Sequence, residues 1–252
     1  MPNPAPGTRT LKIISYNIQA AIGSEAPSHY VTRVHRQFLH TKAKDDILRK
    51  VGKTIEPYDI ACLQEIDLGG RRSNFESQVK GLFAATSFTD ATFQENRVVR
   101  KISRHGNVIL SRQEMDDAHD LKLPAKMGGR GALIACYPLT DTEHLTIVNL
   151  HLSLGEAEQV YQLEHLADEI DDHRHVVVCG DFNTFPTSPS VKSLIKACKL
   201  KYPGRAKATY PSWGPRHALD HILVSNHIKV ENYGPLKARH SDHLPVAATL
   251  TL

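Results

Sequence analysis

The sequence has few cysteines and few aromatic residues, and it contains no apolar run of membrane-spanning length. Its four cysteines form no Cys-x-x-Cys pair, which argues against a disulfide framework or a zinc site and predicts reduced, buried thiols. No apolar run approaches the roughly 18 residues that a membrane-spanning helix needs. Aromatic residues make up only 6% of the 252 positions, which gives little support for recognition of single strands by base stacking.

The sequence also lacks a strong excess of charge of either sign. The 31 Lys and Arg residues and 27 Asp and Glu residues leave a formal net charge of +4. Basic segments are short, such as RVVRK at 97–101, so the composition permits an anionic substrate without requiring one. The Pro-rich residues 1–10 lack the apolar centre of a signal peptide. We therefore expect a loose leader at 1–10 and a soluble, cytoplasmic protein, monomeric by default.

Short apolar runs predict strands along most of the chain. The predicted strands are 11–19, 59–67, 106–112, 131–139, 145–153, 175–181, 218–225 and 244–252. Several of these runs are apolar throughout, which is typical of sheets covered on both faces. The strands predict a layered α/β fold in a single domain, residues 11–252.

Helical spacing of apolar residues predicts three helices between these strands. They lie within 41–56, 156–172 and 188–199. In the last of them, Ser188 fits the N-cap and Pro189 fits the first helical position. The segments 69–104 and 112–130 are polar and irregular, and we expect them to be loops that face the substrate.

Polar side chains recur where the apolar runs end. In HVVVCGDFNT, residues 175–184, the run ends in Asp181 and Asn183, which are two positions apart and would project to the same side. Other strand ends carry Asn17, Glu65, Asn149, His151, Asp220, His221, Asp242 and His243. Each residue alone has an ordinary explanation as a turn or cap residue. As a group they are harder to explain, because burying carboxylates beside Val and Ile is costly without compensation.

The side chains at these strand ends supply hard oxygen ligands and imidazoles. Carboxylate and amide oxygens suit Mg²⁺ or Mn²⁺, which bind through one or two carboxylates, water and phosphate. Such an ion can polarise a phosphoryl oxygen, while histidines donate hydrogen bonds or move protons. Asparagines can orient water or a phosphoryl oxygen without adding charge. This set of residues therefore indicates metal-assisted hydrolysis of a phosphoester.

The order of the motifs resembles that of a known family. Asn17 is followed by LQEID, HGNVILSR, VNLHLS, GDFNT, LDHILVS and SDHLPV. This series is similar to the endonuclease/exonuclease/phosphatase superfamily, whose members resemble pancreatic deoxyribonuclease. Any one motif is weak, but GDFN and SDHLPV together with the upstream QE are highly specific. The resemblance implies a four-layer α/β/β/α sandwich of two packed, mixed β-sheets flanked by helices.

The resemblance also implies where a cation and the attacking water are held. A divalent ion, usually Mg²⁺ with Mn²⁺ as an alternative, would be bound by Glu65 with help from Asn17 and Asp242. Asp181 would orient or deprotonate the water, and Asn183 would hold a phosphate oxygen.

Three further residues have roles implied by the resemblance. His243 would bind the scissile phosphate or act as an acid or base. Asp220 would orient the His243 imidazole, as carboxylates beside a functional histidine commonly do. His151 would contact the phosphate and assist the leaving group.

Two more residues could contact the substrate phosphate. Asn107 either lies near the phosphate or shapes a turn, and Arg130 either clamps a phosphate oxygen or lies on the surface beside a glycine turn. His221 should point to the face of its strand opposite Asp220, so we interpret it as structural.

The substrate class stays open at the level of the sequence. Gln19 stands where abasic-site endonucleases usually carry an acidic residue or Asn, which disfavours that activity. A phosphodiesterase acting on nucleic acid, that is a nuclease, is favoured by the basic pI. The alternatives are a phosphodiesterase or phosphatase for a phospholipid head group or small phosphoester, and a non-catalytic phosphate-binding module.

Overall fold

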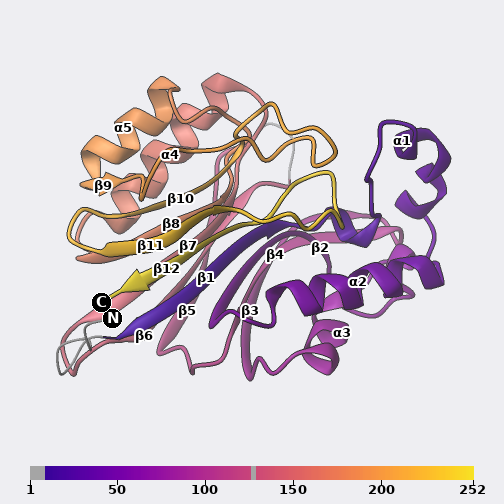
Figure 1. Ribbon diagram of the computed structural model, residues 1–252, viewed down its shortest axis with the longest axis horizontal. Helices are drawn as coiled ribbons and strands as arrows, with labels where there is room; N and C mark the ends of the chain where they lie inside the picture. The colour runs from indigo at the N-terminus through magenta and orange to yellow at the C-terminus, as the bar shows by residue number, and fades with distance from the viewer. Residues whose placement is uncertain (1–8, 126–128) are drawn as a thin grey trace.

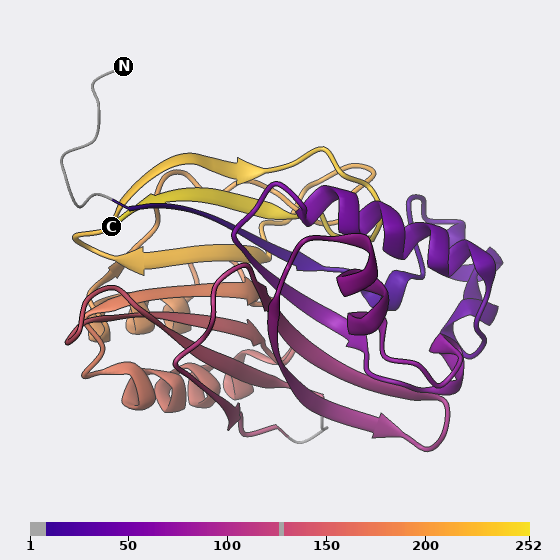
Figure 2. The same cartoon turned by 90° about the horizontal axis from the view of Figure 1, so that it is seen from below.

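The structure, a computed structural model, describes residues 9–125 and 129–252. Figures 1 and 2 show two β-sheets packed face to face, with helices on the outer face of each sheet. Both sheets have six strands and are mixed, because each contains one parallel pair among antiparallel ones. The predicted α/β/β/α sandwich is confirmed.

The first sheet has the strand order β11-β12-β1-β2-β4-β3. Its strands are β11 (Lys229–Pro235), β12 (Val246–Thr251), β1 (Thr10–Asn17), β2 (Ile60–Asp67), β4 (Ser103–Ser111) and β3 (Asp90–Val99). Because β1 and β2 run parallel, their carboxyl ends lie at the same end of the sheet. β12 runs antiparallel to β1, so the segment that leads into β12 reaches this end too.

The second sheet has the strand order β5-β6-β7-β8-β10-β9. Its strands are β5 (Asp117–Lys122), β6 (Gly131–Pro138), β7 (His144–His151), β8 (His175–Asp181), β10 (Asp220–Ser225) and β9 (Leu200–Lys201). β7 and β8 are the parallel pair and end together. β10 runs antiparallel to β8, so β10 begins where β8 ends.

Helices cover the outer faces of both sheets. The longer helices are α2 (Lys42–Ile55) and α3 (Gln78–Ala85) on the first sheet, and α4 (Glu156–Ile170) and α5 (Pro189–Ala197) on the second. Short helices are η1 (Gln19–Ala21), α1 (His29–Thr32), η2 (Val34–Gln37) and η3 (Arg71–Ser73). The predicted start of α5 is confirmed, because Oγ of Ser188 accepts a hydrogen bond from the backbone N–H of Val191.

Three apolar cores separate the four layers. The central core lies between the sheets and includes Ile13 of β1 and Val177 of β8. Ile14, the next residue of β1, lies in the core under α2 and α3, because successive strand side chains point to opposite faces. Val178 likewise lies in the core under α4 and α5. Strands buried on both faces carry continuous apolar runs, which is why the sequence reveals them.

A buried asparagine joins the two sheets through the central core. Nδ2 of Asn149 in β7 donates to the carbonyls of Leu63 in β2 and Val108 in β4, at 3.0 and 2.9 Å. Its Oδ1 accepts from Nε2 of Gln64 at 2.7 Å. All three bonds cross from one sheet to the other, so they fix the position of the sheets relative to each other.

The expectation of loops is wrong for most of 69–104 and, within 112–130, for the residues of β5. The two segments contain α3, β3, β5 and the start of β4, and residues 126–128 lie outside the described residues. β3 and β5 are edge strands with many exposed polar side chains, so they lack an apolar run. The expected leader falls mostly outside the described residues, and a single domain over 11–252 stays a prediction.

The four cysteines are free thiols, as expected, but only two of them are buried as predicted. Cys62 and Cys179 are buried, and Cys136 and Cys198 are partly buried. Among residues 9–125 and 129–252, no helix combines the length and the apolar character that crossing a membrane would need.

Candidate active site

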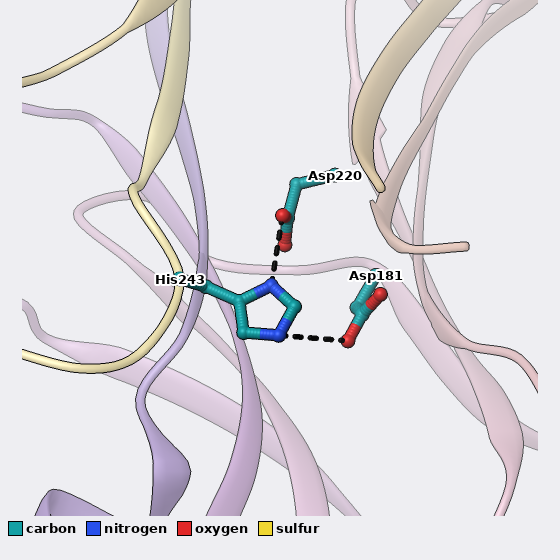
Figure 3. Close-up of side chains that lie close together, drawn as sticks. All are labelled: Asp181, Asp220 and His243. Atoms are coloured by element: carbon teal, nitrogen blue, oxygen red, sulfur yellow. Dashed lines mark hydrogen bonds and ion pairs between the residues drawn. The ribbon is translucent and has the colours of Figure 1, made fainter. Parts of the chain in front are cut away.

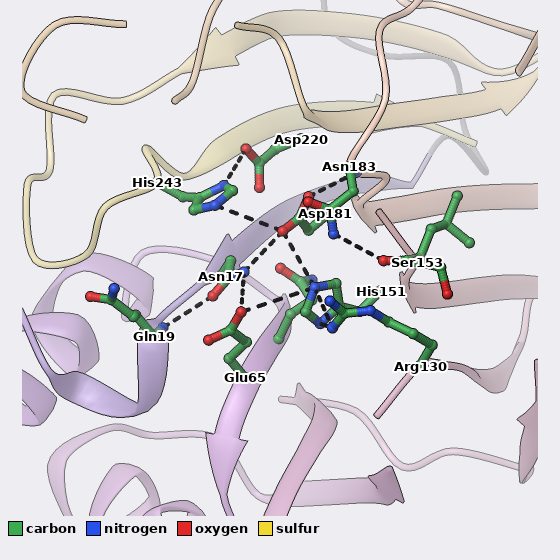
Figure 4. A network of polar contacts seen from close by, with 12 residues as sticks. Asn17, Gln19, Glu65, Arg130, His151, Ser153, Asp181, Asn183, Asp220 and His243 are labelled. Atoms are coloured by element: carbon green, nitrogen blue, oxygen red, sulfur yellow. Dashed lines mark hydrogen bonds and ion pairs between the residues drawn. The ribbon is translucent and has the colours of Figure 1, made fainter. Parts of the chain in front are cut away.

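Polar side chains from both sheets meet at one end of the sandwich (Figure 4). The cause is strand direction, because both parallel pairs end there and the antiparallel strands β10 and β12 begin there. The predicted residues that lie at this end are Asn17, Glu65, His151, Asp181, Asn183, Asp220, Asp242 and His243. The residues of this site are far apart in the sequence, from Asn17 to His243, and the fold brings them together where the two sheets meet.

A histidine lies between two buried carboxylates at the centre of this cluster (Figure 3). Nδ1 of His243 is 2.9 Å from Oδ2 of Asp220, and Nε2 is 3.8 Å from Oδ2 of Asp181. Oγ1 of Thr209 also donates to Oδ2 of Asp220, at 2.5 Å. One ligand atom from each of Asp181, Asp220 and His243 lies within 4.8 Å of the others, so the three could also hold a metal ion.

Burial and mutual charge shift the pKa values of this cluster. Burial raises the pKa of the Asp181 carboxyl to about 7, against the lowering effect of His243. Burial opposes a charge on His243, but Asp220 and Asp181 outweigh it and raise the pKa of the imidazole well above its usual value. Near neutral pH the cluster therefore holds a charged imidazole beside a carboxylate that can accept a proton.

An irregularity in β2 presents Glu65 to the cluster. The pairing of β2 with β4 shifts between Leu63 and Ile66, and Glu65 has a φ of 55°. Such a bulge changes the direction of a side chain that regular pleating would direct elsewhere. Oε1 of Glu65 accepts from Nδ2 of Asn17 at 3.2 Å, and the side chain is one-third exposed.

Asn17 connects the two sheets within the site. Its Nδ2 donates to Glu65 and, at 3.0 Å, to Oδ2 of Asp181 in the other sheet. Its Oδ1 accepts from the backbone N–H of Gln19 at 3.1 Å. In this structure Asn17 therefore acts as a hydrogen-bond donor to the carboxylates.

Asp242 is held by donors from the first sheet's loops. Its Oδ2 accepts from Nε2 of Gln19 at 2.9 Å and from the hydroxyl of Tyr30 at 2.8 Å. Its Oδ1 accepts from Oγ of Ser241 at 3.1 Å. These contacts fix the carboxylate next to His243 in the chain.

The turn after β8 is both capped and part of the site. The backbone N–H of Asn183, whose φ is 50°, donates to Oδ1 of Asp181 at 3.0 Å. Nδ2 of Asn183 donates to the carbonyl of Leu152 at 2.9 Å. Asp181 thus caps its own turn with one oxygen and faces Asn17 with the other.

Replacing Gly180 by alanine should destabilise the fold by about 2 kcal/mol or more. An added Cβ would lie 1.9 Å from the carbonyl oxygen of Leu150, and the residue has a φ of 145°. The urea midpoint of unfolding measures the effect. Gly214→Ala is the control, because no atom lies within 4 Å of its added Cβ. Equal midpoints for the two variants would contradict this account.

His151 and Arg130 form the opposite side of the cluster. Nη1 of Arg130 lies 3.2 and 3.0 Å from the two ring nitrogens of His151. Nε2 of His151 lies 3.5 Å from Oδ2 of Asp181. Burial and then Arg130 lower the pKa of His151 well below its usual value. His151 is therefore a neutral imidazole beside a permanent cation.

Two other predicted residues lie outside this cluster. Asn107 is fully buried, and its Nδ2 donates to Oε1 of Gln94 and the carbonyl of Gly131, both at 3.2 Å. His221 is buried, with Nε2 2.9 Å from the carbonyl oxygen of Thr184, and its structural role stays an interpretation.

Sequence reasoning missed several residues that support the site. Tyr30, Thr209 and Ser241 contact its carboxylates, and the ring of Tyr210 lies 4.9 Å from the ring of His243. Most of them come from irregular segments, where no periodicity marks a functional residue. Gln19 stood out in the sequence only as a departure from an expected acid.

Comparison with known proteins identifies relatives along almost the whole chain. Residues 14–243 match a family model described as the Endonuclease/Exonuclease/phosphatase family. A similar fold occurs in an endonuclease/exonuclease/phosphatase from Beutenbergia cavernae DSM 12333, with a TM-score of 0.76 and 22% identity over 97% of this chain and 72% of that one.

Two solved structures with more specific names share the fold. A mannosyl-6-phosphatase of Bacteroides thetaiotaomicron VPI-5482 has a TM-score of 0.72 and 16% identity over 96% of this chain and 100% of that one. The human Nocturnin catalytic domain, solved with bound sulfate, has a TM-score of 0.70 and 21% identity over 96% and 94%. Because the family model covers most of its residues, the chain belongs to the endonuclease/exonuclease/phosphatase family.

Proposed function

We propose that the protein is a divalent-metal-dependent phosphodiesterase, most simply a nuclease, which cleaves a P–O bond by attack of water. Family membership supports hydrolysis of phosphoesters. The observation that carries the proposal is the His243 imidazole between Asp220 and Asp181, at the end where both sheets contribute polar side chains. The net charge of +4 is compatible with an anionic substrate.

The proposed cofactor is Mg²⁺, with Mn²⁺ as an alternative. Glu65 fits a hard cation, because its Oε2 has no hydrogen-bond partner among the described residues and the side chain lines an open cavity. The side-chain oxygens of Asn17 and Asp242 would be the other ligands that the protein supplies to this cation. When bound, such an ion supplies Lewis-acid polarisation of a phosphoryl oxygen.

Side chains of the protein would activate the water, donate the proton and bind the phosphate. Asp181, with a pKa of about 7, would orient the attacking water and accept its proton. His243, oriented by Asp220, would donate a hydrogen bond to the phosphate or a proton to the leaving oxygen. Asn183 and His151 would bind phosphate oxygens without adding charge of their own.

Arg130 would add a guanidinium to the same phosphate site. Asn107 is left out of the proposal, because its side chain is fully buried and its Nδ2 donates to two interior partners. A cytoplasmic location and a monomeric state stay predictions.

A second candidate is hydrolysis of a small phosphoester or a phospholipid head group. It is favoured by the fold shared with the Bacteroides mannosyl-6-phosphatase. Salt dependence separates the candidates, because a polymer of phosphates gives a steep loss of affinity with salt and a small ligand does not. A non-catalytic phosphate-binding module is the least favoured, because the acids and histidines of the expected set are present.

The test is a substrate panel with Mg²⁺ and with Mn²⁺. It contains plasmid DNA, single-stranded DNA, RNA, bis-p-nitrophenyl phosphate, sphingomyelin and inositol phosphates, with the Asp181→Ala protein as control. We expect turnover of a phosphodiester that stops on addition of EDTA and returns with Mg²⁺. Undiminished turnover in EDTA would exclude a requirement for a divalent metal. Turnover confined to phosphomonoesters would favour the second candidate.

A further inference from the structure

A cavity of about 460 Å³ opens beside the catalytic cluster. Glu65, Arg130 and His151 form its border with the cluster, and Arg97, His105 and the first turn of α4 form other parts of its wall. Figure 4 shows Arg130 and His151 on the side of Asp181 away from His243. The cavity therefore continues the site in one direction, beyond the groups assigned to the scissile phosphate.

Two guanidinium groups in this cavity lack acidic partners among the residues that the structure describes. Arg130 contacts His151 and the carbonyl of Gly129, and neither carries a negative charge. The side chain of Arg97 makes no hydrogen bond or ion pair with any residue of 9–125 or 129–252, although its aliphatic part lies against Gly129. By contrast, Arg104 on the neighbouring strand pairs with Glu95. Unpaired guanidinium groups at the wall of a cavity favour an anionic ligand.

His105 offers the cavity a neutral hydrogen-bond donor. Its Nδ1 lies 3.1 Å from Nη2 of Arg72, which can only donate, so Nδ1 accepts and the proton is on Nε2. Burial and then Arg72 lower the pKa of His105 to about 4, which keeps the ring neutral. Arg72 is itself held by a buried ion pair with Asp67, so the orientation of the donor is fixed.

Two carboxylates also line the cavity. Glu65 is the proposed cation ligand, so its charge would be balanced by the ion, and Glu158 lies in the first turn of α4. Arg97, Arg130 and His105 lie in the same wall as these two acids. The donors thus outnumber the acids at this wall.

We propose that this cavity binds a second phosphate group of the substrate, next to the scissile one, through Arg97 and His105. The inference rests on the proposed function for the scissile phosphate and deepens it. The substrate class would be a phosphoester that carries a neighbouring phosphate, as in a nucleic-acid backbone or a small bisphosphate. Arg97 is then a specificity-determining residue, because it contacts the part of the substrate that does not react.

The test compares ligands with one and two phosphates by calorimetry. Thymidine 3′,5′-bisphosphate is compared with thymidine 5′-phosphate and 3′-phosphate, with Mg²⁺, in the Asp181→Ala background to prevent turnover. We expect the bisphosphate to bind about tenfold more tightly or better, and Arg97→Gln to remove that advantage. Arg104→Gln is the matched control and should keep it. Inositol 1,4-bisphosphate and inositol 1-phosphate repeat the comparison without a base.

An equal affinity for one and two phosphates, or an advantage that survives Arg97→Gln, would overturn the inference. An advantage in both ligand series supports recognition of phosphate alone, and an advantage only in the thymidine series supports a nucleotide substrate. Hydrolysis of bis-p-nitrophenyl phosphate, which has a single phosphate, should be unchanged by the control substitution Arg104→Gln. If the unmodified protein hydrolyses nothing, the proposed function fails, while the binding comparison still tests the cavity.

Discussion

His243→Ala is expected to lower kcat for a phosphodiester by about 10²–10⁴-fold. The ring lies between Asp220 and Asp181, at 2.9 and 3.8 Å. Its removal takes away a positioned proton donor and leaves Asp220 without its charged partner. The measurement is kcat for bis-p-nitrophenyl phosphate with saturating Mg²⁺, alongside a thermal melt to confirm folding.

His240→Ala provides the matched control for this experiment. His240 lies in the same loop and is partly buried, but its contact with the Tyr16 hydroxyl is made by its backbone N–H. We expect the His240 variant to keep kcat within about twofold, since its side chain makes no hydrogen bond to the described residues of the site. Full activity in the His243 variant would contradict the assignment of the site.

Asp67→Ala is expected to cause the largest loss of stability, about 3–5 kcal/mol. Asp67 is fully buried at the end of β2 and pairs with the buried Arg72. It also accepts from the backbone N–H groups of Gly69 and Gly70, at 2.9 and 2.7 Å, and from Oγ of Ser73 at 2.8 Å. The variant leaves a buried cation and several donors without partners. Urea unfolding at neutral pH measures the difference.

The pH dependence of this difference tests its electrostatic origin. Burial alone would raise the pKa of Asp67, but Arg72 and the Gly70 amide outweigh it and hold the pKa below its usual value. A carboxyl with a lowered pKa stabilises the fold above its ordinary pKa of about 4 and loses this contribution as the pH falls. The difference in the free energy of unfolding between the unmodified protein and Asp67→Ala should therefore become smaller as the pH falls below about 4.

Asp46→Ala is the control for the buried pair. Asp46 pairs with Arg49 on α2, where both side chains are more than half exposed. Exposed pairs contribute about 1 kcal/mol or less, so this variant should unfold close to the unmodified protein. If Asp46→Ala lost as much stability as Asp67→Ala, the effect would come from removing a carboxylate in general and not from the burial of the ion pair.

The sequence predicts the interior strands well and misses the edges. Each predicted run corresponds to an interior strand, and β8 spans 175–181 as expected. The four strands without a prediction, β11, β3, β5 and β9, are the edges of the two sheets. An edge strand has neighbours on one side only and keeps many side chains in water, so its sequence need not be apolar. The periodicity that identifies interior strands is absent there.

The candidate site could be predicted where it depends on strand ends. Asp181, Asp220 and His243 lie beside apolar runs, and the order of the motifs along the chain is enough to associate them. Asn107 also belongs to such a motif, yet its burial depends on packing against Gln94 and Gly131, which lie elsewhere in the chain. Long-range packing of this kind has no local signature in the sequence.

The hydrogen bonds of Asn149 align the two halves of the site. Glu65 comes from the first sheet and His243 from the segment that leads into it, and Asp181 and Asp220 come from the second sheet. A small shift of one sheet relative to the other would separate these groups. Because a displacement of about 1 Å can lower a rate by about 10²-fold, catalysis should be lost on heating before the sheets unfold. The hydrogen bonds of Asn149 in the central core thus keep the site residues of the two sheets at the distances that the proposed reaction needs.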